Sequence, residues 1–243
     1  MKGNSSVKRG RRTRLSPQQR RAQLIELGVE LLASRSLDQI SVEDIADRAG
    51  VSRGLLFHYF GSKHDFQVAV VQHISRDMLE RTAPDESLDP MEMLRGTVVA
   101  YVDYVTERPA TYVSMLRGSV SGDPDMRAVF EETRRAMVER TVTHLPSIGI
   151  DVDAMVRLAV RGWVAFVEDI TIAWLQEQGI SPSPAHDPDT APNHDSALTR
   201  EQFVDLAVAA LPAVVASAQP DSIGGLPSEP IAVETSRAGP VVP

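Results

Sequence analysis

Residues 41–63 (SVEDIADRAGVSRGLLFHYFGSK) constrain the fold of this chain more than any other stretch. Ser41 favours a helix N-cap, and Asp44 three residues later resembles the acidic partner of a capping box. Gly50 supplies the backbone freedom that a sharp turn needs. Ser52 then suits the N-cap of a second helix. The pattern predicts two short helices joined by a tight turn.

The second of these helices is predicted to run from Arg53 to about Tyr59, with an apolar side made by Leu56 and Phe60. Two short helices joined in this way are the geometry that places one helix in a DNA major groove. Arg53 at its start carries a planar guanidinium that can donate two hydrogen bonds to a guanine edge. We therefore expect this helix to read DNA.

This stretch resembles the DNA-binding domain of the TetR (tetracycline-repressor-like) family of bacterial transcription regulators. The resemblance covers about residues 18–66 and is carried by Ile45-Ala46, Ala49-Gly50-Val51-Ser52, Tyr59-Phe60 and Ser62-Lys63. It implies an all-α chain, with an N-terminal three-helix helix-turn-helix domain followed by a helical ligand-binding and dimerisation domain. The residues expected to contact DNA are Ser41, Val42, Ser52, Arg53, Gly54, Leu55, Phe57, His58, Tyr59 and Lys63.

Three positions depart from the usual family pattern. Leu55 stands where a Thr or Ser is common, and Phe57 stands where a Tyr is common. Both substitutions remove a side-chain polar group that the family often uses to contact the DNA backbone. Either side chain could instead touch a thymine methyl group. Ser36 replaces the usual Gly after the first helix, so we expect that turn to be built differently. We expect the basic arm at residues 1–15 to offset the lost contacts.

Charge is divided unevenly along the chain. Residues 1–63 hold 12 Lys and Arg against 6 Asp and Glu, a balance of +6. The remainder holds 13 basic and 27 acidic residues, a balance of −14. The net charge of −8 would argue against a nucleic-acid binder, but this division favours one, because the basic end suits phosphates.

The rest of the chain predicts further helices and no strands. The predicted organisation is a disordered basic arm over 1–15, a helix-turn-helix domain over 16–61, a helical effector-binding and dimerisation domain over 62–218, and a disordered tail over 219–243. Pro212 is predicted to kink or shorten the last helix. Helices are expected over about 17–34, 41–49, 53–59, 62–81, 90–106, 109–118, 124–145, 151–178 and 199–218, with a Pro-rich loop over 180–198.

The predicted helix that starts at Asp151 carries apolar faces too wide for a single intrachain core. The resemblance implies that the last two helices pair with those of a second subunit, and a monomer with a thick core is the alternative. It also implies a small-molecule pocket whose filling moves the fourth helix. The candidate pocket residues, each of which would also suit a plain core, are Tyr101, Tyr104, Tyr112, Met115, Phe130, Met137, Thr141, Trp163 and Phe166.

The Met and aromatic content of this set favours an apolar or amphipathic effector. Four polar groups lie inside apolar segments and could fix a charged end of the effector, although ion-paired or solvated faces explain them better. These groups are Arg117, Arg134, Glu168 and Asp169.

Composition and motifs limit the other classes of protein. The chain has no cysteine, which excludes disulfides and thiolate metal sites and fits a cytoplasmic location. It has no uninterrupted apolar run of membrane-spanning length and no apolar stretch typical of a secretory signal. We expect no enzyme, cofactor or metal site, since the acids and histidines at 186–195 lie in the Pro-rich loop. The remaining alternative is an architectural DNA-binding protein without an effector.

Overall fold

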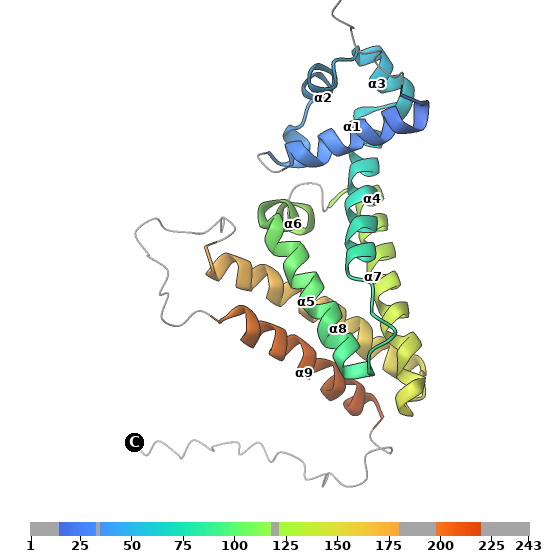
Figure 1. Cartoon of the computed structure of the whole chain (residues 1–243), viewed down its shortest axis with the longest axis vertical. Coiled ribbons are helices and arrows are strands. Elements are labelled where there is room, and N and C mark those ends of the chain that lie inside the picture. Colours follow the sequence, from blue (N-terminus) through green and yellow to red (C-terminus); the bar gives the residue numbers. More distant parts are fainter. Residues whose placement is uncertain (1–14, 33–34, 118–121, 180–197, 220–243) are drawn as a thin grey trace, which may run out of the picture.

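The computed structural model describes residues 15–32, 35–117, 122–179 and 198–219. Every regular element in these ranges is helical, which confirms the all-α prediction. Figure 1 shows the first helices of the chain packed together as a head at one end of the molecule. The head consists of α1 (Pro17–Leu31), the 3-10 helix η1 (Leu37–Gln39), α2 (Val42–Ala49) and α3 (Arg53–Phe60).

A long helix, α4 (Lys63–Arg81), runs from the head into the body and packs against α7. In the body, α8 also packs against α7 and α9 (Figure 1). The body elements are α5 (Pro90–Glu107), α6 (Pro109–Arg117), α7 (Pro124–His144), the 3-10 helix η3 (Leu145–Ile148), α8 (Ala154–Glu177) and α9 (Arg200–Ala218).

Serine side chains begin the helices of the head. The hydroxyl groups of Ser16, Ser41, Ser52 and Ser62 each accept a hydrogen bond from a backbone amide in the first turn of α1, α2, α3 and α4. These bonds satisfy donors that a helix start otherwise leaves unpaired. Gly50 ends α2 with a φ of 63°, the left-handed conformation that glycine adopts without strain. The helix-turn-helix geometry therefore follows from local sequence.

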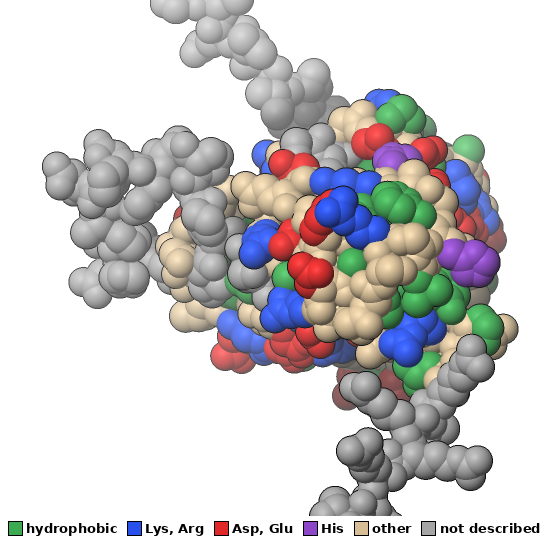
Figure 2. Space-filling model, turned by 90° about the horizontal axis from the view of Figure 1, so that it is seen from above, with side chains coloured by type: hydrophobic (Ala, Val, Ile, Leu, Met, Phe, Trp, Pro, Cys, Tyr) green, Lys and Arg blue, Asp and Glu red, His purple; other side chains and the backbone are tan. Residues whose placement is uncertain are grey.

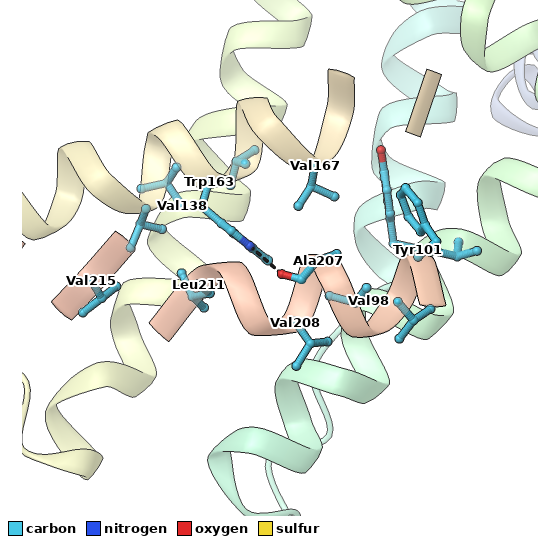
Figure 3. Packing of buried hydrophobic residues seen from close by; sticks show 14 of the residues in the cluster. Val98, Tyr101, Val138, Trp163, Val167, Ala207, Val208, Leu211 and Val215 are labelled. Carbon is cyan, nitrogen blue, oxygen red and sulfur yellow. Dashed lines mark hydrogen bonds between the residues drawn. The ribbon is translucent and has the colours of Figure 1, made fainter. Parts of the chain in front are cut away.

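The core of the body surrounds Trp163 of α8. Figure 3 shows this side chain pointing from α8 towards α9, with its indole N–H directed at the carbonyl oxygen of Ala207. The hydrogen bond is 2.8 Å long and satisfies the one polar atom of the ring. Val160, Val164 and Phe203 are buried in the same cluster, so α8 and α9 are held together by apolar packing.

Several predicted boundaries were wrong by a few residues. Helix α1 ends at Leu31, before Ser34. Helix α8 begins after Asp153, whose carboxylate caps the Val156 amide, and not at Asp151. Helix α9 ends at Ala218, as predicted, so Pro212 does not shorten it. The two 3-10 helices were not predicted, because three or four residues are too few to show a period.

Three predicted segments fall outside the described residues. They are almost all of the basic arm at 1–15, the Pro-rich loop at 180–198 and the tail at 219–243. By length and composition, α9 is the one helix of the described chain that would also suit a membrane span. Six of its side chains are buried in the body core, as in the core helix of a globular domain.

Candidate DNA interface and effector cavity

Helix α3 lies on the surface of the head and buries only one side. Leu56 and Phe60 enter the head core, where the Phe60 ring packs edge-on against Phe66 of α4. The exposed side consists of Arg53, Gly54, Phe57 and His58. Leu55 and Tyr59 lie at the border and are half-buried, and Tyr59 packs against the head core. This division leaves one face of a short helix free to enter a groove.

Arg53 is exposed on this face and forms an ion pair with Glu43 of α2. Its Nη1 lies 2.7 Å from Oε1 of Glu43 on α2, and 65% of the Arg53 side chain is exposed. An exposed ion pair of this kind contributes little to stability, so it is easily exchanged for a base or a phosphate. A Cβ atom built on neighbouring Gly54 meets only Ser52 Oγ, at 3.9 Å, so the start of α3 has room for close approach.

Ser41 and Val42, two predicted DNA contacts at the start of α2, use their side chains within the fold. The Ser41 hydroxyl accepts from the Asp44 amide, and the Asp44 carboxylate accepts from the Ser41 amide, both at 3.0 Å. The Ser41 hydroxyl, the Ser41 amide and then Arg35 lower the pKa of Asp44 to about 2. The Val42 side chain is buried, so only its backbone amide could face DNA.

Lys63 lies at the first position of α4, beside the end of α3. Its Nζ donates to the carbonyl oxygen of Asp38 at 2.9 Å. This bond ties α4 to the turn before α2 and leaves ammonium protons for a phosphate. Figure 2 views the molecule from the head end and shows basic side chains mixed with acidic and apolar ones. The described surface of the head is therefore not uniformly basic.

A cavity of about 220 Å³ lies inside the body, and we call it the main cavity. Side chains of α5, α7, α8 and α9 line it, and most of them are apolar. Four residues of the predicted pocket are among them, namely Tyr101, Met137, Thr141 and Trp163. Thr82 and Pro84 also border it, so the cavity reaches the end of α4.

A second, side cavity of about 70 Å³ lies nearer the head. It shares Tyr101, Met137 and Glu168 with the main cavity, so these three side chains stand between the two spaces. It also contains Tyr104, Tyr112, Met115 and Phe130 of the predicted pocket. The two cavities thus account for every predicted lining residue except one.

Phe166 is the exception and corrects the prediction. It lines neither cavity, and 38% of it is exposed on the outer face of α8. Its neighbours on that face, Met155 and Leu158, are more exposed still. Helical spacing alone could not distinguish this outer face from the cavity side, because both carry large apolar residues.

The polar groups that the sequence singled out are mostly paired with one another. Arg134 Nε lies 2.6 Å from Oε2 of Glu168, and Arg117 pairs with Asp169 at the surface. Burial raises the pKa of Glu168, while Arg134 opposes this shift. The hydroxyl groups of Tyr101 and Tyr112 are hydrogen-bonded to each other. The ion-paired interpretation of these charged residues is therefore confirmed.

Sequence reasoning missed Arg140 and His144 as lining residues of the main cavity. Both follow Met137 at helical spacing, three and seven positions on, so they share its face of α7. Arg140 lies near the end of α7 beside another charged residue, Glu139, so its charge did not distinguish it. The periodicity that indicated Met137 and Thr141 would have identified Arg140 as well.

His64 joins the first turn of α4 to the start of α7. Its Nε2 lies 2.8 Å from Oδ2 of Asp125, and its Nδ1 lies 3.9 Å from Oδ2 of Asp123. The Asp125 carboxylate raises the pKa of His64. Because each ring nitrogen faces a different carboxylate, the arrangement suits an imidazolium ion pair.

Comparison with known proteins agrees with this geometry. Residues 24–70 match the bacterial regulatory proteins of the tetR family, and residues 90–209 match the tetracyclin repressor-like C-terminal domain. The chain is 28% identical over 168 residues to the HTH-type transcriptional activator FasR of Mycolicibacterium smegmatis, covering 68% of this chain and 76% of that protein. It is 33% identical over 103 residues to the HTH-type transcriptional repressor KstR2 of the same species, covering 40% of this chain and 48% of that protein.

A solved structure extends the likeness to the whole fold. A tetR-family transcriptional regulator from Streptomyces coelicolor superimposes with a TM-score of 0.65 at 27% sequence identity. The match covers 85% of this chain and 86% of the other. The head and the body of the molecule therefore both match regulators of the same family. The chain belongs to the TetR family of bacterial regulators, DNA-binding transcription regulators that are not enzymes.

Proposed function

We propose that this regulator acts as a homodimeric repressor that leaves a palindromic operator when a small apolar or amphipathic effector fills the main cavity. The observation that carries the proposal is the position of that cavity. It is bordered by Thr82 and Pro84, which directly follow α4, and α4 carries the head at its other end. A change in the cavity therefore acts on the helix that positions α3.

The DNA contacts of the proposal centre on the exposed face of α3. Arg53 reads a base edge, and Phe57 supplies an apolar surface for a thymine methyl group. Lys63, His58 and Tyr59 contact the backbone. One short helix discriminates weakly, whereas two copies about one DNA turn apart read a palindromic site.

The outer face of α8 supports the homodimer. Met155, Leu158 and Phe166 are exposed along it, with Gly162 between them, and Leu206 is exposed on neighbouring α9. Large apolar side chains gathered on one face mark an interaction site more often than an ordinary surface. A second copy of the same face would cover them in an isologous interface.

The effector releases the operator by shifting the equilibrium between two arrangements of the heads. A ligand moves this equilibrium only if it prefers the arrangement whose spacing does not fit the operator. The main cavity borders the end of α4, so a ligand that occupies it can favour one arrangement of the heads over the other.

Two measurements on the full chain test this function. Light scattering should give about twice the 26.5 kDa chain mass. Leu158→Asp should lower the measured mass towards that of one chain, while the exposed loop variant Leu88→Asp should not.

A binding selection on random DNA should return a palindrome. A flat preference across sequences would instead favour an architectural protein without an effector.

A reporter assay decides the direction of regulation. Deleting the gene should raise expression from a promoter that carries the selected palindrome, since a bound repressor blocks transcription. A fall in expression would show that the protein activates, as the name of its relative FasR says of that protein.

A further inference from the structure

Arg140 of α7 connects the main cavity to the end of α4. It lines the cavity and is half-buried. Its Nη2 donates to the carbonyl oxygen of Leu79 at 2.7 Å, and its Nη1 donates to that of Thr82 at 2.8 Å. Carbonyl groups in the last turn of a helix have no partner within the helix. Arg140 therefore acts as a cap on the C-terminus of α4.

The charge of Arg140 has no carboxylate partner among the described residues. Burial lowers the pKa of Arg140, but a guanidinium stays protonated in proteins. Glu168 is the acidic side chain of the lining, and Arg134 already neutralises it at 2.6 Å. The described lining of this apolar cavity thus carries one uncompensated positive charge.

The guanidinium also has hydrogen-bonding capacity to spare. Of its five N–H groups, those of Nε and one of Nη2 have no acceptor in the described part of the chain. Nε and Nη2 lie along one edge of the guanidinium, and such an edge matches the two oxygens of a carboxylate. His144, four residues further along α7, also lines the cavity, and its ring N–H is a second donor.

We infer that the effector of the main cavity is an amphipathic anion, with an apolar body among Val98, Trp163 and Val167 and an acidic group bound to Arg140. This inference rests on the proposed role of the cavity as the effector site. The volume of about 220 Å³ lies below the range of roughly 300–1,000 Å³ typical of drug-sized ligands. The enclosed part of the effector is therefore small.

The contact with Arg140 also explains how a charged effector changes the position of the head. A hydrogen bond from a guanidinium to a carboxylate is stronger than one to a neutral carbonyl. A carboxylate in the cavity binds the free N–H groups and draws the guanidinium away from Leu79 and Thr82, so it competes with these two carbonyl groups and weakens the cap on α4. A neutral ligand of the same shape fills the cavity without this competition.

Three probes of matched length test the inference: octanoate, octanol and octylamine. Their dissociation constants can be measured on the full chain by the fluorescence of Trp163 and Trp174 and by calorimetry, since Trp163 lines the cavity. Octanoate should bind about tenfold more tightly than octanol, as expected for a hydrogen bond to a charged group. Octylamine should bind most weakly.

Variants assign the preference to one residue. Arg140→Gln should bring octanoate and octanol to within about twofold of each other, with octanol binding unchanged, because the charge-assisted bond is lost. Arg140→Lys should keep part of the preference and serves if the Gln variant does not fold. Arg135→Gln changes an exposed arginine of the same helix and should behave like the unaltered protein. A preference that survives Arg140→Gln, or no preference in the unaltered protein, overturns the inference.

A second readout separates this inference from the proposed function. Operator affinity should fall more with octanoate than with octanol at equal occupancy. If octanol binds and releases DNA as well as octanoate does, the effector site stands and the anionic class is wrong. If octanoate binds through Arg140 without changing operator affinity, the anion site stands and the effector function is wrong. If no probe binds, both are wrong.

Discussion

The head and the body differ in how completely their interiors are filled. In the head, Leu24, Ile45 and Leu56 are fully buried, and a Cβ atom added to Gly28 would lie 2.8 Å from Phe66 and Val70. The body core instead encloses the main cavity beside Trp163. A reading helix needs fixed geometry, whereas a ligand-responsive unit needs space. Tight packing and retained volume therefore occur in one chain for different tasks.

The largest expected effect tests this contrast with one substitution in each region. Leu56→Ala in the filled head core should lower the free energy of unfolding by roughly 3–5 kcal/mol, because it leaves a new cavity. Leu211→Ala, at the wall of the main cavity, should cost about 2–3 kcal/mol, since that side chain already has fewer packing partners. Urea unfolding measures both, and equal losses would contradict the contrast.

The next effect concerns the exposed face of the head. Arg53→Ala should cost about 1–3 kcal/mol of binding to the selected operator and relax one base position. Fluorescence anisotropy on the operator and its single-base variants measures this. Arg157→Ala serves as the control, because it lies near the start of α8 in the body, away from the head (Figure 1). Equal weakening on every sequence would assign Arg53 to a phosphate.

Two glycines sharpen the difference in packing through the sign of one substitution. Gly28→Ala should destabilise the protein by about 1 kcal/mol, because crowding against Phe66 and Val70 outweighs the gain in helix propensity. Gly96→Ala in α5 meets nothing within 4 Å and should stabilise it by about 1 kcal/mol. Thermal unfolding of the two variants checks the opposite signs. A stabilising effect of Gly28→Ala would show that Phe66 and Val70 can shift to accommodate the added methyl group.

Lys63 should show a smaller and less specific effect than Arg53. Lys63→Ala should weaken binding to all sequences and reduce the slope of log affinity against log salt by about 1. Its bond to the Asp38 carbonyl also ties down the turn before α2, so Lys63→Arg is the matched variant. Titrations at several salt concentrations decide between the roles. An unchanged slope would leave Lys63 with only the structural one.

The smallest effect concerns the joint between the two regions. Because Asp125 raises the pKa of His64, the protonated pair stabilises the folded state fully below the unfolded-state value of 6.5. This stabilisation is lost as the pH rises from 6.5 through the raised pKa. His64→Gln should remove this part of the pH dependence of unfolding, and the change should be small because the pair is exposed. An identical pH profile in the variant would show that the pair contributes nothing.

Local signals made most of the helix boundaries predictable. Ser52 and Gly50 define the turn before α3, and Asp123-Pro124 defines the start of α7. These residues act on their immediate neighbours, so no distant partner is needed to interpret them. The error at α8 arose because Asp151 and Asp153 are both capable caps, and only the native backbone selects the second.

The site was less predictable, because its parts are far apart in the chain. Trp163 and Phe166 both fit an apolar helix face, yet only packing against α7 and α9 places one at the cavity and leaves the other outside. Arg140 gains its role from Leu79 and Thr82, which lie 61 and 58 residues earlier. No periodicity in α7 alone could reveal that contact.

The sequence by itself determined the helices, the turn before α3 and the residues that α3 exposes, since caps and apolar spacing act over a few positions. Only the tertiary structure decided where the body keeps an empty volume and which charge faces it. A cavity is a property of how several helices fail to fill the space between them. Its position beside Arg140 therefore appears only once α4, α7 and α8 are packed together.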